Sequence, residues 1–187
     1  MIAYAIDVRY YDPKDPDYYS KAGEWKKDYV VAIIWPGIKM DTVVQMIINS
    51  ITAAGFGKNT VEKVRMAGHG NSGTMQFGEG LTKDNADEFE KLAPYLTVDQ
   101  YKTGIELHGC GVGSSTSVAG SGSSVSSPVC VPGTSGKGAG YDLLLALAKA
   151  TTRNTAAGIN CQFADSDWKF EGPYMVVNPN GSYGIIS

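Results

Sequence analysis

Strand-like apolar runs alternate with helix-like runs along this chain, and this alternation limits its possible folds more than any other feature. Residues 29–35 are continuously apolar and end at Pro36, as in a strand that is covered on both faces. Apolar residues then recur at helical spacing over 44–51, and Asp41 is the expected N-cap of that helix. We therefore predict an α/β fold with a mostly parallel central sheet and helices on both faces.

The same patterns predict the other elements of the fold. Two further helices are expected over 83–92 and 141–150. The other expected strands are 2–11, 61–67, 104–108 and 155–163, with a short pair around 74–77 and a closing hairpin of 174–177 and 182–186.

The chain has the size and composition of one globular domain, which we expect to span 1–187. It is 43% hydrophobic and 19% charged, as ordinary globular proteins are. The net charge is −3 and no Lys/Arg block could follow a phosphate backbone, so we expect no nucleic-acid partner. No apolar run approaches the ~20 residues of a membrane span, and residues 1–7 resemble a first strand rather than a signal peptide.

The three cysteines, Cys110, Cys130 and Cys161, form an odd number without short paired spacing. This argues against a disulfide framework and against a zinc ribbon, so we expect a reducing compartment and a cytoplasmic protein. A zinc site built from His69, His108, Cys110 and Cys161 is a remote alternative, because the spacing matches no known ligand pattern. We expect no metal and no cofactor.

Two of the predicted strands end on a reactive residue that lies between two glycines. His69 follows strand 61–67 in this way, and Cys110 follows strand 104–108. Catalytic groups of open α/β sheets gather beyond the carboxyl ends of the strands, and a thiol needs a nearby imidazole to become a good nucleophile. We therefore predict that Cys110 is a nucleophile, that His69 is its base, and that the amides of Gly70 and Cys110 hold the oxyanion.

A charge pattern supports the expectation that these two strands are neighbours. Arg65 comes four residues before His69, and Glu106 comes four residues before Cys110. In neighbouring strands of matching register, these opposite charges would lie at similar height on one face. We predict a cross-strand ion pair between Arg65 and Glu106.

Simpler interpretations of these residues remain open. A lone Cys at a strand end is more often a small buried hydrophobe, and a lone His is more often a satisfied polar residue. His108 is a rival base, which we expect to be structural because its side chain lies inside the sheet. Residues 68–73 also spell the dinucleotide fingerprint G-x-G-x-x-G, but 74–78 do not have the pattern of the helix that it requires.

The motifs resemble the caspase-like cysteine peptidases, the clan that includes clostripain and the metacaspases. The likeness covers residues 29–163, and it is closest to bacterial caspase-like domains with His-Gly and Gly-Cys motifs. It rests on His69-Gly70, the segment 75–78 and the segment 109–113. The resemblance implies a three-layer sandwich with a C-terminal hairpin, and a Cys-His dyad that hydrolyses a peptide or protein substrate. His108-Gly109 stands where the stricter caspase signature has Gln-Ala, so aspartate specificity does not follow.

The resemblance also suggests substrate-binding and processing residues. We expect Asp165 and Asp167 to line a pocket for Lys or Arg, as acidic groups do in clostripain-like relatives; two solvated loop carboxylates are the simpler alternative. Residues 111–138 are almost entirely Gly, Ser, Thr, Val and Pro, which predicts a mobile loop. Loops at this position are often cut during activation in such enzymes, and here the cut would follow Lys137.

A function of another class stays possible. The chain would then be a catalytically inactive caspase-like binding or scaffolding domain with a vestigial dyad. The sequence does not separate this alternative from the peptidase, and it does not indicate the oligomeric state.

Overall fold

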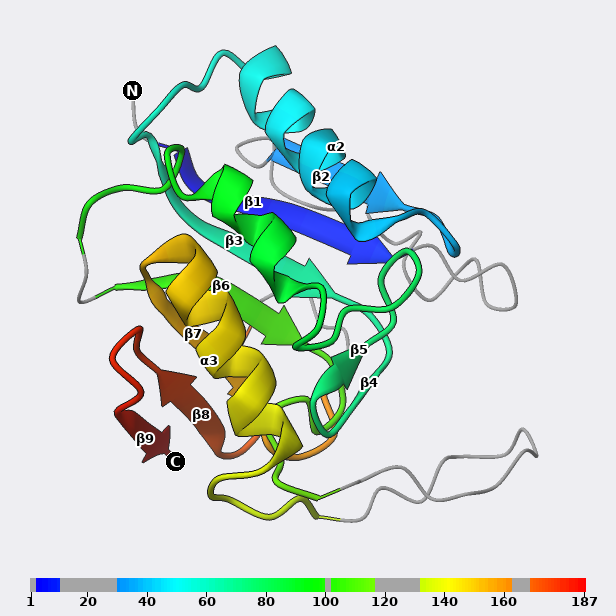
Figure 1. The fold of residues 1–187 in the computed structure, drawn as a ribbon, viewed down its shortest axis with the longest axis vertical. Helices are drawn as coiled ribbons and strands as arrows, with labels where there is room; N and C mark the ends of the chain where they lie inside the picture. Colours follow the sequence, from blue (N-terminus) through cyan, green and yellow to red (C-terminus); the bar gives the residue numbers. More distant parts are fainter. Residues whose placement is uncertain (1–2, 11–29, 100–101, 117–131, 163–168) are drawn as a thin grey trace.

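The chain folds around one seven-stranded sheet in the order β2-β1-β3-β6-β7-β8-β9 (Figure 1). The computed structural model describes residues 3–10, 30–99, 102–116, 132–162 and 169–187. The first five strands in that order run parallel, and β8 and β9 are antiparallel to their neighbours. The mostly parallel sheet and the C-terminal hairpin are therefore confirmed. The strands are β1 (Ala3–Tyr10), β2 (Val30–Ile34), β3 (Val61–Ala67), β6 (Thr103–His108), β7 (Asn154–Gly158), β8 (Tyr174–Val177) and β9 (Tyr183–Ile186).

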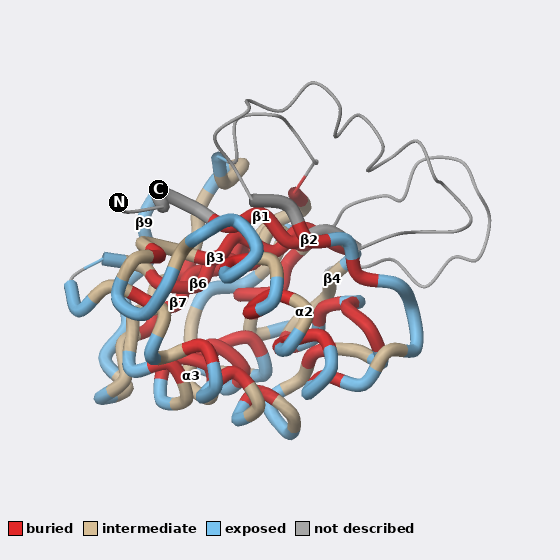
Figure 2. Tube along the Cα trace, turned by 90° about the horizontal axis from the view of Figure 1, so that it is seen from above, coloured by how far each residue is buried: buried red, intermediate tan, exposed pale blue. Residues whose placement is uncertain are grey.

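The helices that the structure describes all lie against one face of this sheet (Figures 1 and 2). They are α2 (Met40–Ala53), the 3-10 helix η2 (Ala86–Leu92) and α3 (Ala139–Thr151). Within the described ranges, no helix covers the opposite face. The predicted α/β architecture is thus present, with helices seen on one face.

The face of the sheet that meets the helices is apolar. Thr155 of β7 identifies this face, because its hydroxyl donates a hydrogen bond to the Leu144 carbonyl of α3 at 2.7 Å. The strand register places Ile105, Val64 and Ile6 in the same row as Thr155, and all three are fully buried. Burying each such side chain contributes about 1.5–3 kcal/mol, so this row is a large part of the core.

Helix α2 is capped differently from the prediction. Lys39 is its N-cap residue and makes no side-chain capping bond, while Asp41 lies inside the first turn. The Met40 N–H instead donates to Glu79 Oε1 at 3.0 Å. The predicted N-cap was wrong because the true acceptor is distant in sequence. Asp41 still favours the helix, because a negative charge in the first turn opposes the helix dipole.

The segment predicted as a helix over 83–92 forms the shorter 3-10 helix η2. Its buried residues are Ala86, Phe89 and Leu92, which are the three that the sequence placed on the apolar face. Their spacing of three residues matches the 3.0 residues per turn of a 3-10 helix. The apolar face was therefore correct, and the helix type was not.

The segment after β6 packs closely against the end of β7 in its described part. Residues 111–114 are buried. The Ser114 hydroxyl oxygen accepts the Thr134 N–H at 3.0 Å, which ties together the two described parts of the predicted loop. Hydrogen bonds and close main-chain packing hold 111–116 and 132–138 against each other and against β7, and the mobility of the loop stays a prediction. The rest of that predicted loop lies outside the described residues.

A short hairpin follows β3, and it lies at 70–75 rather than around 74–77, where the strand pair was expected. It consists of β4 (Gly70–Asn71) and β5 (Thr74–Met75), which pair antiparallel. Gly73, in the turn, has a φ of 67°, a conformation that glycine adopts easily. Because a hairpin follows Gly68, the dinucleotide fingerprint lacks the helix that would bind the pyrophosphate.

Candidate active site

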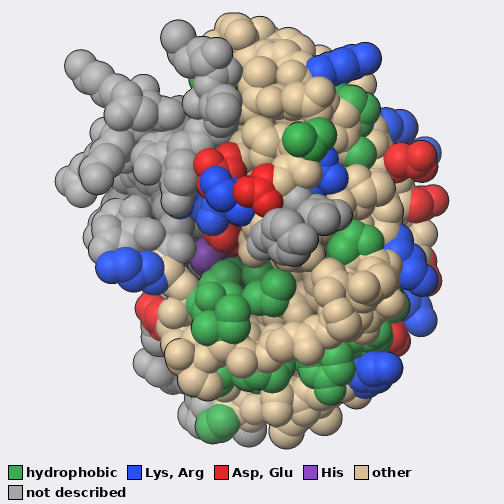
Figure 3. All heavy atoms as spheres, turned by 90° about the vertical axis from the view of Figure 1, so that its left-hand side faces the viewer, with side chains coloured by type: hydrophobic (Ala, Val, Ile, Leu, Met, Phe, Trp, Pro, Cys, Tyr) green, Lys and Arg blue, Asp and Glu red, His purple; other side chains and the backbone are tan. Residues whose placement is uncertain are grey.

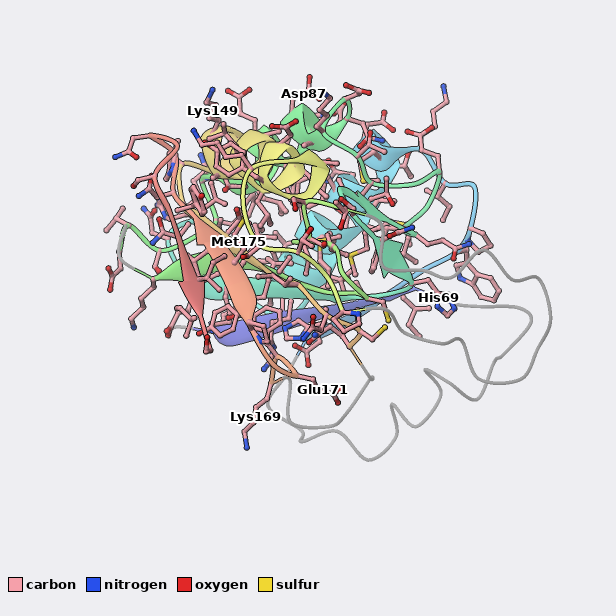
Figure 4. The ribbon with its side chains drawn as sticks, turned by 90° about the horizontal axis from the view of Figure 1, so that it is seen from below. His69, Asp87, Lys149, Lys169, Glu171 and Met175 are labelled. Carbon is pink, nitrogen blue, oxygen red and sulfur yellow. The ribbon has the colours of Figure 1, made fainter. Side chains whose placement is uncertain are left out.

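The two candidate catalytic residues follow neighbouring strand ends. Strands β3 and β6 pair in parallel, and Ala67 at the end of β3 is in register with His108 at the end of β6. His69 and Cys110 each come two residues later, at the same rim of the sheet. Figure 4 shows His69 at the edge toward which the parallel strands point. The predicted adjacency of the two strands is confirmed.

Glycines allow the two strand ends to touch through their main chains. A Cβ atom on Gly70 would lie 3.1 Å from the Gly109 carbonyl carbon and 3.2 Å from the Cys110 carbonyl oxygen. A Cβ atom on Gly109 would lie 2.9 Å from the Gly68 carbonyl oxygen. Larger residues at these positions would separate the two loops. The glycines beside His69 and Cys110 therefore have a packing role as well as a place in the motif.

His69 is exposed at this rim. Its carbonyl oxygen accepts the Gln76 N–H at 2.7 Å, so the β4–β5 hairpin holds its main chain. An exposed imidazole on a fixed main chain can reach a substrate and exchange protons with it, which a general base must do.

Cys110 is a half-buried free thiol. Its sulfur lies 3.4 Å from the main-chain nitrogen of Gln162 and 3.4 Å from the carbonyl oxygen of the same residue. The thiol can donate to that carbonyl, and the sulfur can accept from that N–H. Gln162 follows β7, which pairs with β6, so a third strand end supports the site. Sequence reasoning missed Gln162; its only signal was its place after the strand that follows the Cys110 strand.

Cys161 is disulfide-bonded, although the number and spacing of the cysteines argue against a disulfide framework. Of the two cysteines that the structure describes, Cys110 is the free thiol at the rim. The disulfide restrains the main chain directly before Gln162.

Arg65 and Glu106 face each other in register, as predicted, but each forms its ion pair with another residue. Arg65 Nε and Nη2 both lie 2.9 Å from Asp7 Oδ1. Glu106 Oε1 lies 2.6 Å from Lys63 Nζ. The predicted partner was wrong because Asp7 of β1 is in register on the other side of Arg65, and Lys63 lies two residues along the same face of β3. This face of the sheet carries a row of charges.

The carboxylate of Glu106 is stabilised in its ionised form. Burial raises the pKa of Glu106, but the hydrogen bonds and charges of His108 and Lys63 outweigh burial and hold that pKa below its ordinary value of 4.5. In Figure 3, acidic and basic side chains gather beside a His side chain on the surface.

His108 is held within this group of charges. Its Nε2 lies 3.5 Å from Glu106 Oε2, and its side chain is 8% exposed. The ring stacks on Phe170 at a centroid distance of 4.4 Å, and Phe170 stacks on Tyr174 at 4.6 Å. These contacts are typical of a structural histidine, and they leave His69 as the accessible imidazole at the rim.

The predicted processing residue lies at the start of α3. Lys137 is exposed, and its Nζ lies 5.2 Å from the centroid of the Tyr141 ring. Gly138 is the N-cap residue of α3, and its carbonyl accepts the Asp142 N–H at 2.9 Å. Cleavage after Lys137 would therefore require the first turn of α3 to open.

The predicted substrate-binding residues Asp165 and Asp167 lie outside the described residues. In the part of the chain that the structure describes, no three His, Cys, Asp or Glu side chains are grouped so as to hold a metal ion. No helix of that part has both the length and the apolar character that crossing a membrane requires.

Comparisons with protein-family models, with curated proteins and with solved structures find no match for this chain. The geometry of its own residues is therefore the basis for proposing a function.

Proposed function

We propose that this chain is a caspase-like cysteine peptidase in which Cys110 and His69 form the catalytic dyad. The observation that carries the proposal is the main-chain contact between two glycine-flanked strand ends, which bear a free thiol and an exposed imidazole at one rim. Catalytic groups concentrate at this rim in open α/β sheets. The three-layer caspase-like sandwich is part of the proposal, and the mostly parallel sheet supports it.

The chemistry would proceed by acyl transfer. His69 takes the thiol proton as the Cys110 sulfur bonds to the scissile carbonyl carbon, and the amides of Gly70 and Cys110 stabilise the negative oxygen. His69 then protonates the leaving amine as the C–N bond breaks, which leaves a thioester on Cys110. Water attacks the thioester with His69 as base, releases the acid product and restores the thiol.

The proposal includes a substrate preference. Peptide cleavage after Lys or Arg would use Asp165 and Asp167, because carboxylates bind these cationic side chains well. Self-processing in the segment 111–138 would use Lys137, since no other Lys, Arg, Asp or Glu occurs there. The partner is a peptide or protein.

The decisive experiment is a peptide-library cleavage profile of the wild type against Cys110→Ala and His69→Ala. We expect the wild type to hydrolyse a subset of peptides, and each variant to lose at least about 10³-fold in kcat/KM, as for other nucleophile and base deletions. The thermal midpoints of the variants should match the wild type, because His69 is exposed and the Cys110 side chain is small. Cleavage that persists in Cys110→Ala would refute the proposal.

A wild type that cleaves no peptide would favour the inactive binding or scaffolding domain. The labelling rate of Cys110 by iodoacetamide separates the two functions further. An enzyme should show a rate that falls in His69→Ala, whereas a vestigial dyad should label at the same rate in both proteins.

A further inference from the structure

The main chain of Gln162 contacts the sulfur of Cys110. The N–H and the carbonyl of this single residue both lie 3.4 Å from Sγ, one as a donor and the other as an acceptor. A sulfur held by two groups of fixed relative geometry is restricted to one side-chain rotamer. The direction of the thiol therefore depends on where the Gln162 main chain is held.

The side chain of Gln162 holds that main chain in place. It is buried, with 6% exposure, and both the oxygen and the nitrogen of its amide form hydrogen bonds. Its Oε1 accepts the Glu171 N–H at 2.9 Å, and its Nε2 donates to the Glu171 carbonyl at 3.0 Å. The same Nε2 lies 3.1 Å from the Cys161 carbonyl oxygen. A buried amide satisfied in this way connects the segment after β7 to the segment before β8.

The surroundings of Gln162 are shaped to admit its side chain. A Cβ atom on Gly158 would lie 2.5 Å from both Cδ and Nε2 of Gln162, so glycine leaves the space that the amide occupies. The carbonyl of Asn160 accepts the Gly111 N–H at 2.8 Å, which ties this segment to the residue after Cys110. The disulfide of Cys161 restrains the segment further.

We propose that Gln162 is a positioning residue that sets the direction of the Cys110 thiol. Its catalytic consequence rests on the proposed function, because it assumes that Cys110 is the nucleophile. Its structural content does not, because the amide of Gln162 should restrict the Cys110 rotamer whether or not the chain cleaves peptides.

The test uses Gln162→Met, which keeps the length of the side chain and removes its polar contacts. The control is Gln45→Met, the same change at an exposed position of α2. The first readout is the pair of Hα–Hβ couplings of Cys110 in cysteine-labelled protein, measured by NMR. We expect one large and one small coupling in the wild type and in Gln45→Met, and two averaged couplings in Gln162→Met.

The second readout is peptide hydrolysis. A misdirected nucleophile should lower kcat by about 10- to 100-fold with a smaller change in KM. Gly158→Ala is an independent variant that displaces the Gln162 amide without changing that residue. It should give the same averaged couplings, and it takes the place of Gln162→Met in the test if that variant does not fold.

Each outcome bears on one proposal. A folded Gln162→Met or Gly158→Ala protein with wild-type couplings would overturn the positioning role, even if the wild type is an active peptidase. If the variants show averaged couplings but the wild type cleaves no peptide, the positioning role is supported and the proposed function is overturned.

Discussion

Gly70 lies so close to Cys110 that a Cβ atom at residue 70 would be 3.2 Å from the Cys110 carbonyl oxygen. The same atom would overlap the Val112 side chain. The chain after β3 and the chain after β6 are therefore in direct contact beside both candidate catalytic residues. This contact depends on the absence of a side chain at residue 70.

Gly70→Ala should therefore damage both stability and activity. Overpacking of this kind costs about 1–3 kcal/mol, and the shift of the strand ends should also reduce peptide hydrolysis. Urea unfolding and kcat/KM measure the two effects. Gly57→Ala is the matched control, since a Cβ atom there would meet nothing within 4 Å. Equal stability and activity of the two variants would contradict the close contact.

Glu106 should make the stability of the protein depend on pH in the acidic range. Its pKa is lowered in the folded state, so its ionised form stabilises the fold above the ordinary value of 4.5. This contribution is lost as the pH falls below 4.5 through the folded pKa. Glu106→Gln should therefore cost about 1–3 kcal/mol near pH 7, and the difference from the wild type should shrink as the pH falls.

The control for this measurement is Glu88→Gln, which disrupts the exposed Lys91–Glu88 pair. Solvent screens that pair, so the unfolding curves of the variant should match the wild type at each pH. A difference between Glu106→Gln and the wild type that does not change with pH would show that Glu106 is not stabilised as a carboxylate.

The cysteines should differ in reactivity under native conditions. Cys161 is disulfide-bonded and Cys110 is free, so iodoacetamide should alkylate Cys110 and leave Cys161 unmodified. After reduction in denaturant, Cys161 should also be alkylated. Peptide mass spectrometry of the two samples gives the answer, and native alkylation of Cys161 would contradict the disulfide. Selective alkylation of Cys110 over Cys161 is thus no evidence for catalysis. The evidence for catalysis is the effect of His69→Ala on the alkylation rate of Cys110.

Self-processing, if it occurs, should produce a new N-terminus at Gly138. The bond after Lys137 lies beside the N-cap of α3, so cleavage should be slow and should accelerate as the first turn of α3 frays with temperature. N-terminal sequencing should find the new end in the wild type, and not in Lys137→Ala or Cys110→Ala. Active enzyme with an intact segment 111–138 would reject this prediction.

Local patterns in the sequence predict where β3 and β6 end and which residues follow them, whereas the strand predicted over 155–163 ends at Gly158. The strand over 61–67 has the predicted bounds, because the glycine that follows it is a purely local signal. The strand before Cys110 begins one residue earlier than predicted, at Thr103. Since parallel strands end at one rim, the shared rim of His69 and Cys110 followed from these bounds.

Ion pairs and helix caps depend on residues that are distant in sequence, and the sequence did not predict these partners correctly. Glu106 forms an ion pair with Lys63 rather than with Arg65, because Arg65 is paired with Asp7 of β1. Glu79 caps α2 from 39 residues away. A local pattern contains no information about such partners.

The order of apolar runs and glycines along this chain was by itself enough to determine a mostly parallel sheet with a histidine and a cysteine beyond adjacent strands. Only the tertiary structure decided that Cys110 is held by Gln162, and that the charges of the sheet pair as they do. The physical reason is that strand formation depends on nearby residues, whereas hydrogen bonds and ion pairs depend on register and distance between segments far apart in the chain.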